Sequence, residues 1–287
     1  MSSITAPTTA SYLAPVRTSA RGHWPSALAA LARRRLSLSA RTPREVIVPL
    51  LNPILFAIVI APALAKLVGN RAGFDYMTFA AVGAVGLLVP INALFAGIGV
   101  IVDRDSGSQR DLLAAPVPRS FLVLSNLGVA LLTTALQVTA LIVAVSLRGA
   151  SFQVSSGGIL WFAGAVGLLA IGMYGVAETL ASRMQKQEEY VGVLPAVAIL
   201  PYFFAGSLFP ISTLPTALAG FAKILPLTHA MAMMRYALVD GRAGGLHDIW
   251  GAGDPTRLAA QSLAILAGFA VLMTVVSMRM FSRKAVQ

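Results

Sequence analysis

YMTFAAVGAVGLLVPINALFAGIGVIV, residues 76–102, runs for 27 residues without an Asp, Glu, Lys or Arg. The hydrocarbon core of a bilayer is about 30 Å thick and a helix rises about 1.5 Å per residue, so roughly 20 apolar residues cross it. Five other uncharged intervals reach that length: Val46–Ala65, Ser120–Leu147, Gly149–Ala177, Tyr190–Ala222 and Leu258–Met278. The sequence therefore predicts a polytopic membrane protein with six transmembrane helices.

The fold class follows from the kind of residue in these intervals. They are continuous runs of Leu, Ala, Val and Ile, without the alternation that transmembrane strands show. Only helices and closed barrels satisfy their backbone hydrogen bonds in hydrocarbon, so we expect an all-α protein. The composition agrees, because 57% of the residues are hydrophobic and 11% are charged, against about 25% charged in soluble proteins. The chain has no cysteine, which excludes thiolate catalysis and thiolate metal sites.

The net charge of +11 is distributed as membrane orientation requires, which argues against nucleic acid as a partner. With six spans, both termini share a side with the loops near 103–119 and 182–189. That side holds 15 of the 22 Lys and Arg residues, and basic residues mark the cytoplasmic side. We therefore expect the chain in the plasma (inner) membrane of a bacterium, surrounded by lipid bilayer, with both termini in the cytoplasm.

Residues 1–44 contain no acidic residue and are predicted to form a cytoplasmic tail and a surface helix. Over residues 24–40 the apolar side chains of Trp24, Leu28, Leu31 and Leu38 share one helical face. Such a helix lies in the membrane interface, with its arginines near anionic headgroups. The Ser, Thr and Arg content also fits an organellar transit peptide, an alternative that the sequence leaves open.

Residues 45–287 are predicted to form a single transmembrane domain, in which the fifth uncharged interval is too long for one simple crossing. Pro210 and Pro215 divide it, because proline interrupts a helix. We expect residues 210–240 to return into the outer leaflet as two short re-entrant helices, followed by a Gly-rich external stretch, 241–255. The predicted spans are 46–65, 78–102, 121–147, 157–181, 190–209 and 258–278.

The cytoplasmic loop DRDSGSQRDLLAAPVPR, residues 103–119, predicts a short helix. Ser108 and Asp111 have the spacing of a capping box, and a proline ends the helix after about two turns. Leu112 and Leu113 leave an apolar edge on an otherwise charged element. A short exposed helix of this kind is suited to docking into the groove of a partner.

Two blocks of sequence point to a known family. The first has the pattern acidic-Arg-acidic-x-Gly, then Leu-Leu, then Pro-x-x-Arg, at Asp103, Arg104, Asp105, Gly107, Leu112, Leu113, Pro116 and Arg119. The second comprises Gly206–Pro210, Leu214-Pro215, Pro226–His229, Arg235 and Gly241. Together they resemble the permease subunits of ABC-2 type transporters, especially drug exporters of the daunorubicin-resistance type, over about residues 45–281. Arg110, followed by Asp111, stands where many relatives have an acidic residue.

The resemblance implies half of a transporter. Two permease chains, identical or paralogous, would form the pathway, and two copies of a separate ABC ATPase subunit would bind beneath and grip the loop. ATP and Mg are then expected on the ATPase, and this chain is expected to bind no cofactor and to be no enzyme by itself. The sequence agrees, because it has no G-x-x-x-x-G-K-[ST] phosphate loop. The expected ATPase-coupling residues are Asp103, Arg104, Asp105, Gly107, Arg110, Asp111, Leu112, Leu113, Pro116 and Arg119.

The resemblance also implies roles for other segments. The surface helix before the first span would act as a gate helix against the ATPase. Spans one, two and five would line the path, with Asn52, Asn92, Tyr202, Phe203 and Phe204 as pathway candidates. The helices after span five would shape the outer gate, with Pro210, Pro215, Pro226, His229 and Arg235. Amides in spans more often bridge neighbouring helices, and aromatic clusters more often pack, so these readings stay open.

Two further residue types have a functional and a structural interpretation. Glu178 is the acidic residue that lies well inside an apolar run, which by default suggests function. Its position near Arg183 at the cytoplasmic end favours a paired structural residue. His229 and His247 have no second ligand at a spacing typical of zinc sites, so no metal is expected.

We interpret the chain as the transmembrane permease subunit of an ATP-driven ABC exporter that moves amphipathic drug-like molecules or lipids out across the plasma membrane. An exporter of lipid-linked glycans is the nearer alternative, and an 8% aromatic content weakly disfavours it. An ion-coupled secondary transporter needs buried titratable groups, of which only Glu178 is evident. An intramembrane enzyme lacks a nucleophile or metal constellation. The substrate and the identity of the ATPase do not follow from the sequence.

Overall fold

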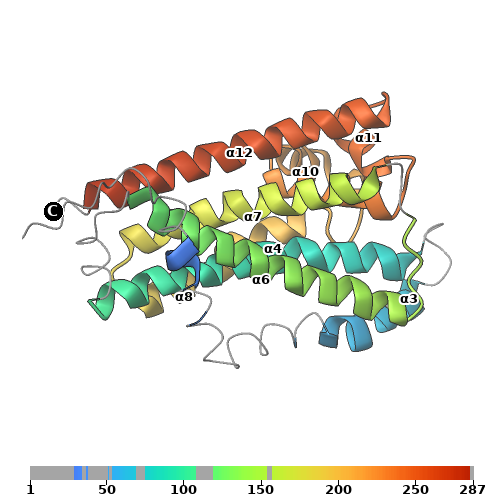
Figure 1. Ribbon diagram of the computed structural model, residues 1–287. Coiled ribbons are helices and arrows are strands. Elements are labelled where there is room, and N and C mark those ends of the chain that lie inside the picture. The colour runs from blue at the N-terminus through green and yellow to red at the C-terminus, as the bar shows by residue number, and fades with distance from the viewer. Residues whose placement is uncertain are drawn as a thin grey trace, which may run out of the picture.

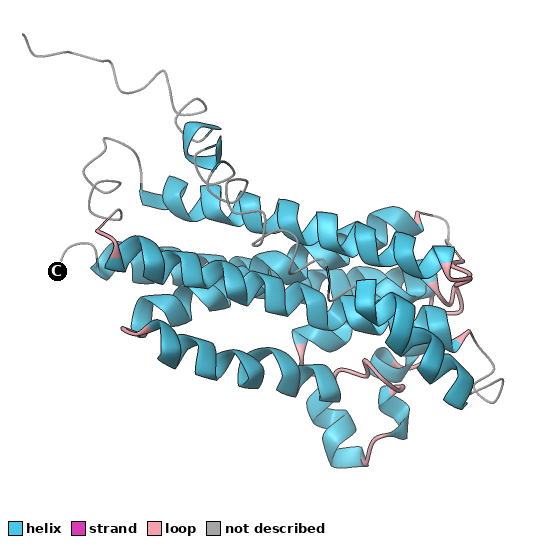
Figure 2. Cartoon of the chain, turned by 90° about the horizontal axis from the view of Figure 1, so that it is seen from below, coloured by secondary structure: helices cyan, strands magenta, loops and turns pink. Residues whose placement is uncertain are grey.

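The computed structural model describes residues 29–33, 37, 51, 54–68, 75–107, 119–153 and 157–284 (Figure 1). Helices joined by short connections make up this part of the chain, and no strand occurs in it (Figure 2). The predicted all-α class is confirmed. The elements are η1 (Phe56–Ile60, a π-helical turn), α3 (Ala61–Val68), α4 (Tyr76–Asp105), α6 (Arg119–Leu147), α7 (Gly158–Arg183), α8 (Gln187–Phe204), η3 (Ile211–Thr213), α9 (Thr216–Ala222), α10 (Pro226–Leu238), α11 (Gly244–Trp250) and α12 (Pro255–Lys284).

Four of the described helices are long and apolar enough to cross a membrane: α4, most of α6, α7 and most of α12. Helices α9 and α10 qualify together if the pair, bent by 83°, forms one broken span or a re-entrant loop. Helix α8 is not among them, because its 18 residues include Glu188 and Glu189 in the first turn. The helices are those of a multi-pass membrane protein, and the count of six spans stays a prediction.

The predicted first span, 46–65, lies partly outside the described residues. Its described part is irregular, because the π-helical turn η1 runs directly into α3, which has Pro62 in its first turn. Proline has no N–H to donate to the carbonyl of Ile58, so the regular hydrogen-bond ladder cannot continue there. Of the predicted interfacial helix, residues 29–33 are helical and the rest lies outside the described part.

Two elements differ from the sequence-based expectation. Helix α8 ends at Phe204, before the predicted end of the span at residue 209. Gly206 then adopts a φ of 74°, a left-handed conformation that turns the chain. In the stretch 241–255, expected as an external loop, the chain forms α11. Leu246 of α11 is fully buried, so tertiary packing rather than helix propensity stabilises this short element.

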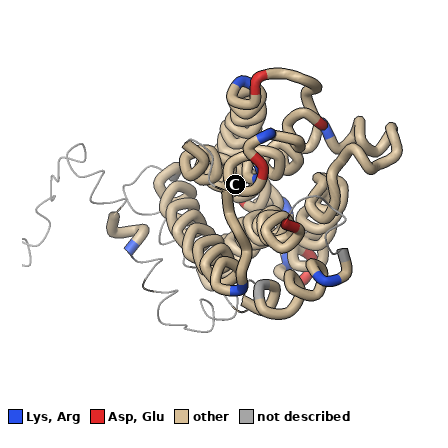
Figure 3. Tube along the Cα trace, turned by 90° about the vertical axis from the view of Figure 1, so that its right-hand side faces the viewer, with Lys and Arg blue, Asp and Glu red and all other residues tan. Residues whose placement is uncertain are grey.

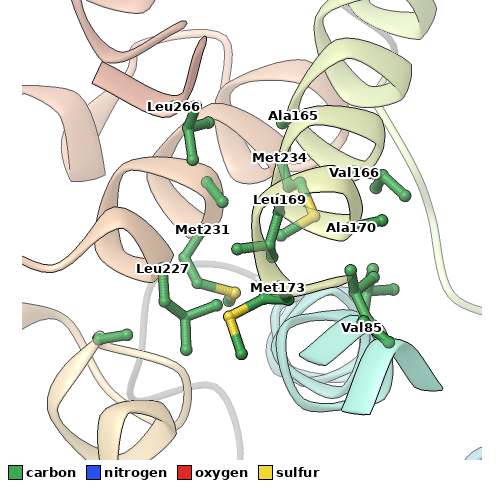
Figure 4. Close-up of a cluster of buried hydrophobic side chains, with 14 of the residues drawn as sticks. Val85, Ala165, Val166, Leu169, Ala170, Met173, Leu227, Met231, Met234 and Leu266 are labelled. Atoms are coloured by element: carbon green, nitrogen blue, oxygen red, sulfur yellow. The ribbon is translucent and has the colours of Figure 1, made fainter. Parts of the chain in front are cut away.

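Helix α7 lies at the centre of the bundle, packed against α12, α4 and α10 (Figure 1). Figure 4 shows part of this core, where Leu169 and Met173 of α7 lie among buried side chains of α10, α4 and α12. Gly172 and Gly175 of α7 permit the close packing of α12. A Cβ atom at Gly175 would lie 2.6 Å from the backbone of Met273, so only glycine fits there. Small residues bring helices together in the same way in other membrane proteins.

The connections separate into two groups at the two ends of the bundle. Residues 106–107, the turn 184–186 and the C-terminal end of α12 share one end, and the start of α4 and residues 148–153 share the other (Figure 1). A view along the helix axes shows charged residues as short, isolated segments in a mainly uncharged bundle (Figure 3). This arrangement agrees with the predicted sidedness of the loops, and which end faces the cytoplasm stays a prediction.

Candidate functional site

Arg235, a predicted outer-gate residue on α10, is a buried cation held by backbone carbonyls. Its Nη1 and Nη2 atoms donate to the carbonyls of Gly206 at 2.5 Å and Ser207 at 2.8 Å, in the segment that follows α8. The guanidinium carbon lies 3.5 Å from the ring centroid of Phe79 on α4, a cation–π geometry. Arg235 therefore ties the segment after the C-terminal end of α8 to α10 and α4.

Two further contacts fix the same junction. A Cβ atom at Gly83 of α4 would lie 2.4 Å from the carbonyl oxygen of Ser207, so the absence of a side chain lets this segment lie directly on α4. The Tyr76 hydroxyl donates to the carbonyl of Leu208 at 3.2 Å. We call Arg235, Phe79, Gly83 and the segment 206–208 the outer junction, after the outer gate that the sequence predicts in this region.

His229, also predicted at the outer gate, forms part of a buried polar group. Its Nδ1 lies 3.2 Å from Ser262 Oγ of α12, and its Nε2 lies 3.0 Å from the carbonyl oxygen of Lys223. Trp250 of α11 packs beside the imidazole, with 5.5 Å between the ring centroids. Its Nε1 donates a hydrogen bond to the same Ser262 hydroxyl at 2.9 Å. Among the described residues no group of three or more His, Cys, Asp or Glu side chains gathers as metal ligands would.

The three prolines predicted at the outer gate each mark the beginning of an element. Pro210 precedes the 3-10 turn η3, Pro215 precedes α9, and Pro226 is the first residue of α10. Proline is favoured at a helix start, where its missing N–H costs no internal hydrogen bond. Two short helices thus occupy the region 210–240, and their re-entry into the membrane remains a proposal.

The aromatic pathway candidates on α8 do not share one face. Tyr202 is buried, whereas Phe203 is 49% exposed. Phe204 makes an edge-to-face contact with Phe221 of α9, with 5.7 Å between the ring centroids. The rings of Tyr202 and Phe203 make an edge-to-face contact, with 5.7 Å between their centroids. The three side chains nevertheless differ, because one is packed, one faces outward and one contacts α9.

Among the amide candidates, Asn92 donates a hydrogen bond from Nδ2 to Oε1 of Gln137, which joins α4 to α6. Gln137 is 1% exposed, so this bond is a buried bridge between helices of the kind that commonly holds spans together. This is the structural alternative to substrate contact. Asn52 lies outside the described residues.

The coupling residues Asp103, Arg104 and Asp105 form the last turn of α4, and Gly107 follows with a φ of 76°. Arg104 donates to the carbonyls of Ala181 at 3.3 Å and Gln185 at 2.9 Å, and its Nε lies 3.5 Å from Asp105. The end of α4 is thereby fastened to the turn between α7 and α8. Arg119 begins α6. The remaining coupling residues, Arg110, Asp111, Leu112, Leu113 and Pro116, lie outside the described part of the chain.

Glu178 of α7 is buried and accepts a hydrogen bond from the Tyr174 hydroxyl at 3.0 Å. The buried Tyr190 hydroxyl donates to the carbonyl of Leu94 at 2.7 Å and fastens α8 to α4. Sequence reasoning missed both tyrosines, because a tyrosine in an apolar run resembles any other core side chain. The partner that the structure gives Glu178 is thus a tyrosine of its own helix, and the pairing near Arg183 that the sequence favoured stays a prediction.

A cavity of about 720 Å³ opens at the end of the bundle that contains Asp75. Asp75 caps α4 by accepting hydrogen bonds from Met77, Thr78 and Ser151. Burial raises the pKa of Asp75, but these hydrogen bonds together outweigh burial and hold the pKa below its ordinary value. No spacing in the sequence indicated this cavity, because its walls come from α4, α10, α11 and residues 151–153.

The apolar helices and their polar junctions define a multi-pass membrane protein. The model of the ABC-2 type transporter family matches residues 26–239, so the chain belongs to this family. The ABC-2 family predicted from the two sequence blocks is therefore confirmed, and the daunorubicin-resistance type stays a prediction.

Three relatives illustrate the similarity. The inner membrane transport permease YadH of Escherichia coli is 24% identical over 205 residues, which cover 70% of this chain and 76% of YadH. Nodulation protein J of Sinorhizobium fredii is 23% identical over 185 residues, 64% of this chain and 70% of that protein. The putative transport permease ycf38 of Porphyra purpurea is 25% identical over 211 residues, 72% of each chain.

Proposed function

We propose that this chain is the transmembrane permease subunit of an ATP-driven exporter in a bacterial plasma membrane. The observation that carries the proposal is the family match over residues 26–239 in a chain that has no phosphate loop of its own. ABC-2 permeases generally work with an ATPase partner, so we place the energy source on a separate ATPase chain. The proposed cargo is an amphipathic drug-like molecule or a lipid, and no catalytic step is assigned to this subunit.

The proposed assembly contains two permease chains and two copies of the ATPase, with ATP and Mg bound on the ATPase. The daunorubicin-resistance type of relative supports a drug-like cargo through the first sequence block, residues 103–119. The apolar surface of the described helices supports contact with lipid along most of the bundle, since side chains such as Leu136, Val143 and Leu160 are more than half exposed.

Arg104 offers a route by which the partner could act on the pathway. The proposed docking loop follows α4 directly, and Arg104 fastens the end of α4 to the carbonyls of Ala181 and Gln185, at the turn before α8. A force on the loop would therefore reach α4, α7 and α8 together. Spans two and five of the predicted pathway correspond to α4 and α8.

The test is Leu112→Asp in a tagged chain expressed together with its ATPase. A carboxylate at the centre of an interface removes the apolar anchor and buries an unpaired charge, so we expect at least tenfold less ATPase recovered with the permease. Export of an amphipathic dye should fall in parallel. The matched control is Leu147→Asp, which makes the same change at an 83% exposed position at the other end of α6.

Three results would overturn the proposal. If no ATPase co-purifies with the unaltered chain, the partner assignment fails. If Leu112→Asp and Leu147→Asp recover equal amounts of ATPase, the loop is not the docking site. If dye export continues when the ATPase is inactivated by substitution of its phosphate-loop lysine, another energy source drives transport.

A further inference from the structure

The cavity near Asp75 has the size of a small-molecule site. Its volume of about 720 Å³ falls within the range of roughly 300–1,000 Å³ that ligand pockets occupy. Three residues of α10, namely Thr228, Ala232 and Arg235, contribute one wall together with Val239, the C-cap residue of this helix. Their spacing of three or four residues places them on one face of the helix.

Two polar side chains on this wall have hydrogen-bonding capacity that the protein does not use. Thr228 is 2% exposed and its Oγ1 has no hydrogen-bond partner, and Arg235 is 8% exposed and its Nε has none, among the described residues. Burying such a group without a partner costs free energy. Thr228 and Arg235 lie seven positions, or about two helical turns, apart along the same wall of the cavity.

The charge of Arg235 is also uncompensated. The guanidinium is bonded to two carbonyl oxygens, and within the described part of the chain no carboxylate lies within 4 Å of it. A buried cation without a counter-charge is unfavourable. The inner wall of the cavity thus favours an anionic group.

The opposite charge lies toward the mouth. Asp75 is exposed, and Asp240 and Asp248 are half-buried, so all three line the cavity from positions nearer to solvent than Arg235. The exposed Arg242 also lines the cavity, and the three carboxylates outnumber this one cation. Each already accepts a local hydrogen bond: Asp240 from the N–H of Gly244 and Asp248 from the Ser212 hydroxyl. The carboxylates therefore favour a cationic group at the mouth.

We propose that this cavity binds a zwitterion, with a phosphate or carboxylate toward Thr228 and Arg235 and an amine toward the carboxylates of Asp240 and Asp248. The inference does not depend on ATP-driven export, because it concerns binding to this chain alone. A phosphoethanolamine group has this chemistry, either as the headgroup of a lipid or as a water-soluble compound.

The first experiment titrates phosphoethanolamine into the purified chain in detergent and measures binding by calorimetry. Glycerol 3-phosphate supplies the anion alone, and ethanolamine supplies the amine alone. We expect phosphoethanolamine to bind at least tenfold more tightly than either. Repeating the titration in nanodiscs distinguishes the two sources of the ligand. If the cavity binds a lipid headgroup, phosphatidylethanolamine competes, and the added phosphoethanolamine binds more weakly in nanodiscs of this lipid than in nanodiscs of phosphatidylglycerol. Equal binding in both lipids identifies a soluble zwitterion.

The variants separate binding from folding. Thr228→Val removes a hydroxyl that has no protein partner, so the folded chain should be as stable as before while binding weakens about tenfold, the value of one hydrogen bond to a charged group. Asp248→Asn should weaken the binding of phosphoethanolamine but leave the binding of glycerol 3-phosphate unchanged. The matched control is Thr134→Val, because Thr134 of α6 is also 2% exposed with an unpartnered hydroxyl and does not line the cavity.

The proposal fails if phosphoethanolamine does not bind at millimolar concentration, or if Thr228→Val binds it as tightly as the unaltered chain. It also fails if Thr134→Val loses as much affinity as Thr228→Val. Equal binding of glycerol 3-phosphate and phosphoethanolamine would show that the amine does not contribute to binding, and the proposal of a zwitterionic ligand would then be wrong.

Discussion

Two arginines fasten the two ends of the bundle with similar hydrogen bonds in different surroundings. Arg235 holds the carbonyls of Gly206 and Ser207 at the outer junction, and Arg104 holds those of Ala181 and Gln185 at the other end. Arg235 is 8% exposed and lies on an aromatic ring, whereas the Arg104 side chain is 31% exposed and lies beside Asp105.

The difference teaches that the number of hydrogen bonds does not decide what an arginine contributes. Water can replace the donors of Arg104 when they are lost, because this end of α4 is accessible to solvent. Water cannot easily reach the carbonyls at the outer junction, so a lost donor there leaves buried acceptors unsatisfied. We therefore expect the outer end to be rigid and the end near the predicted docking loop to be adaptable.

The largest expected effect is that of Arg235→Met. The variant loses two charge-assisted hydrogen bonds and the contact with Phe79, and we expect the free energy of unfolding in detergent to fall by about 3 kcal/mol or more. Arg104→Met should lower it by about 1 kcal/mol or less, as for an exposed ion pair. Thermal unfolding followed by circular dichroism compares the two variants. Equal losses would show that burial does not distinguish the two junctions.

Arg235→Lys sharpens this comparison, because lysine keeps the charge but lacks the fork that reaches two carbonyls. Its stability should lie between those of the unaltered chain and Arg235→Met. If Arg235→Lys is as stable as the unaltered chain, charge alone holds the junction and the two hydrogen bonds contribute little.

The helices of this protein could be predicted from the sequence, but their polar contacts could not. Uncharged length indicated α4, α6, α7 and α12, because in a membrane local hydrophobicity determines the span. Arg235 was singled out by a sequence block, yet its partners are carbonyls of residues 206 and 207, and a carbonyl has no signature in a sequence.

Long-range pairs were equally hidden. Asn92 and Gln137 are 45 positions apart on different helices, and only the packing of α4 against α6 brings them together. Helix α11 was missed because glycines dominate the beginning of its sequence, while the burial of Leu246 that stabilises it depends on the tertiary fold. Local pattern therefore predicts which segments enter a membrane, and tertiary contact decides which side chains meet there.

A second, smaller effect is expected from Gly83→Ala, which tests the outer junction from the side of α4. The added Cβ would lie 2.4 Å from the carbonyl oxygen of Ser207, a backbone atom that must then move. We expect a loss of about 1–3 kcal/mol in the free energy of unfolding, as for other overpacked sites. The matched control is Gly128→Ala on α6, where no atom lies within 4 Å. The control should be neutral or slightly stabilising, and a similar loss in both variants would argue against a tight junction at Gly83.

The smallest expected effect concerns Asp75, which caps the start of α4 beside the outer junction. The pKa of Asp75 is lower in the folded chain than its ordinary value. The stabilisation that the ionised carboxylate gives to the folded chain is therefore fully present at a pH above that ordinary value. This stabilisation is lost as the pH falls through the folded-state pKa, because the protonated carboxyl is a weaker acceptor.

Asp75→Ala should lower the free energy of unfolding by about 0.5–2 kcal/mol at pH 7, the usual value of an N-cap. This difference from the unaltered chain should narrow on acidification toward pH 3. Thermal unfolding of both proteins across that range measures it. Asp248→Ala serves as the comparison, since Asp248 caps no span, and a difference for Asp75→Ala that stays constant with pH would show that the carboxylate's charge does not stabilise the start of α4.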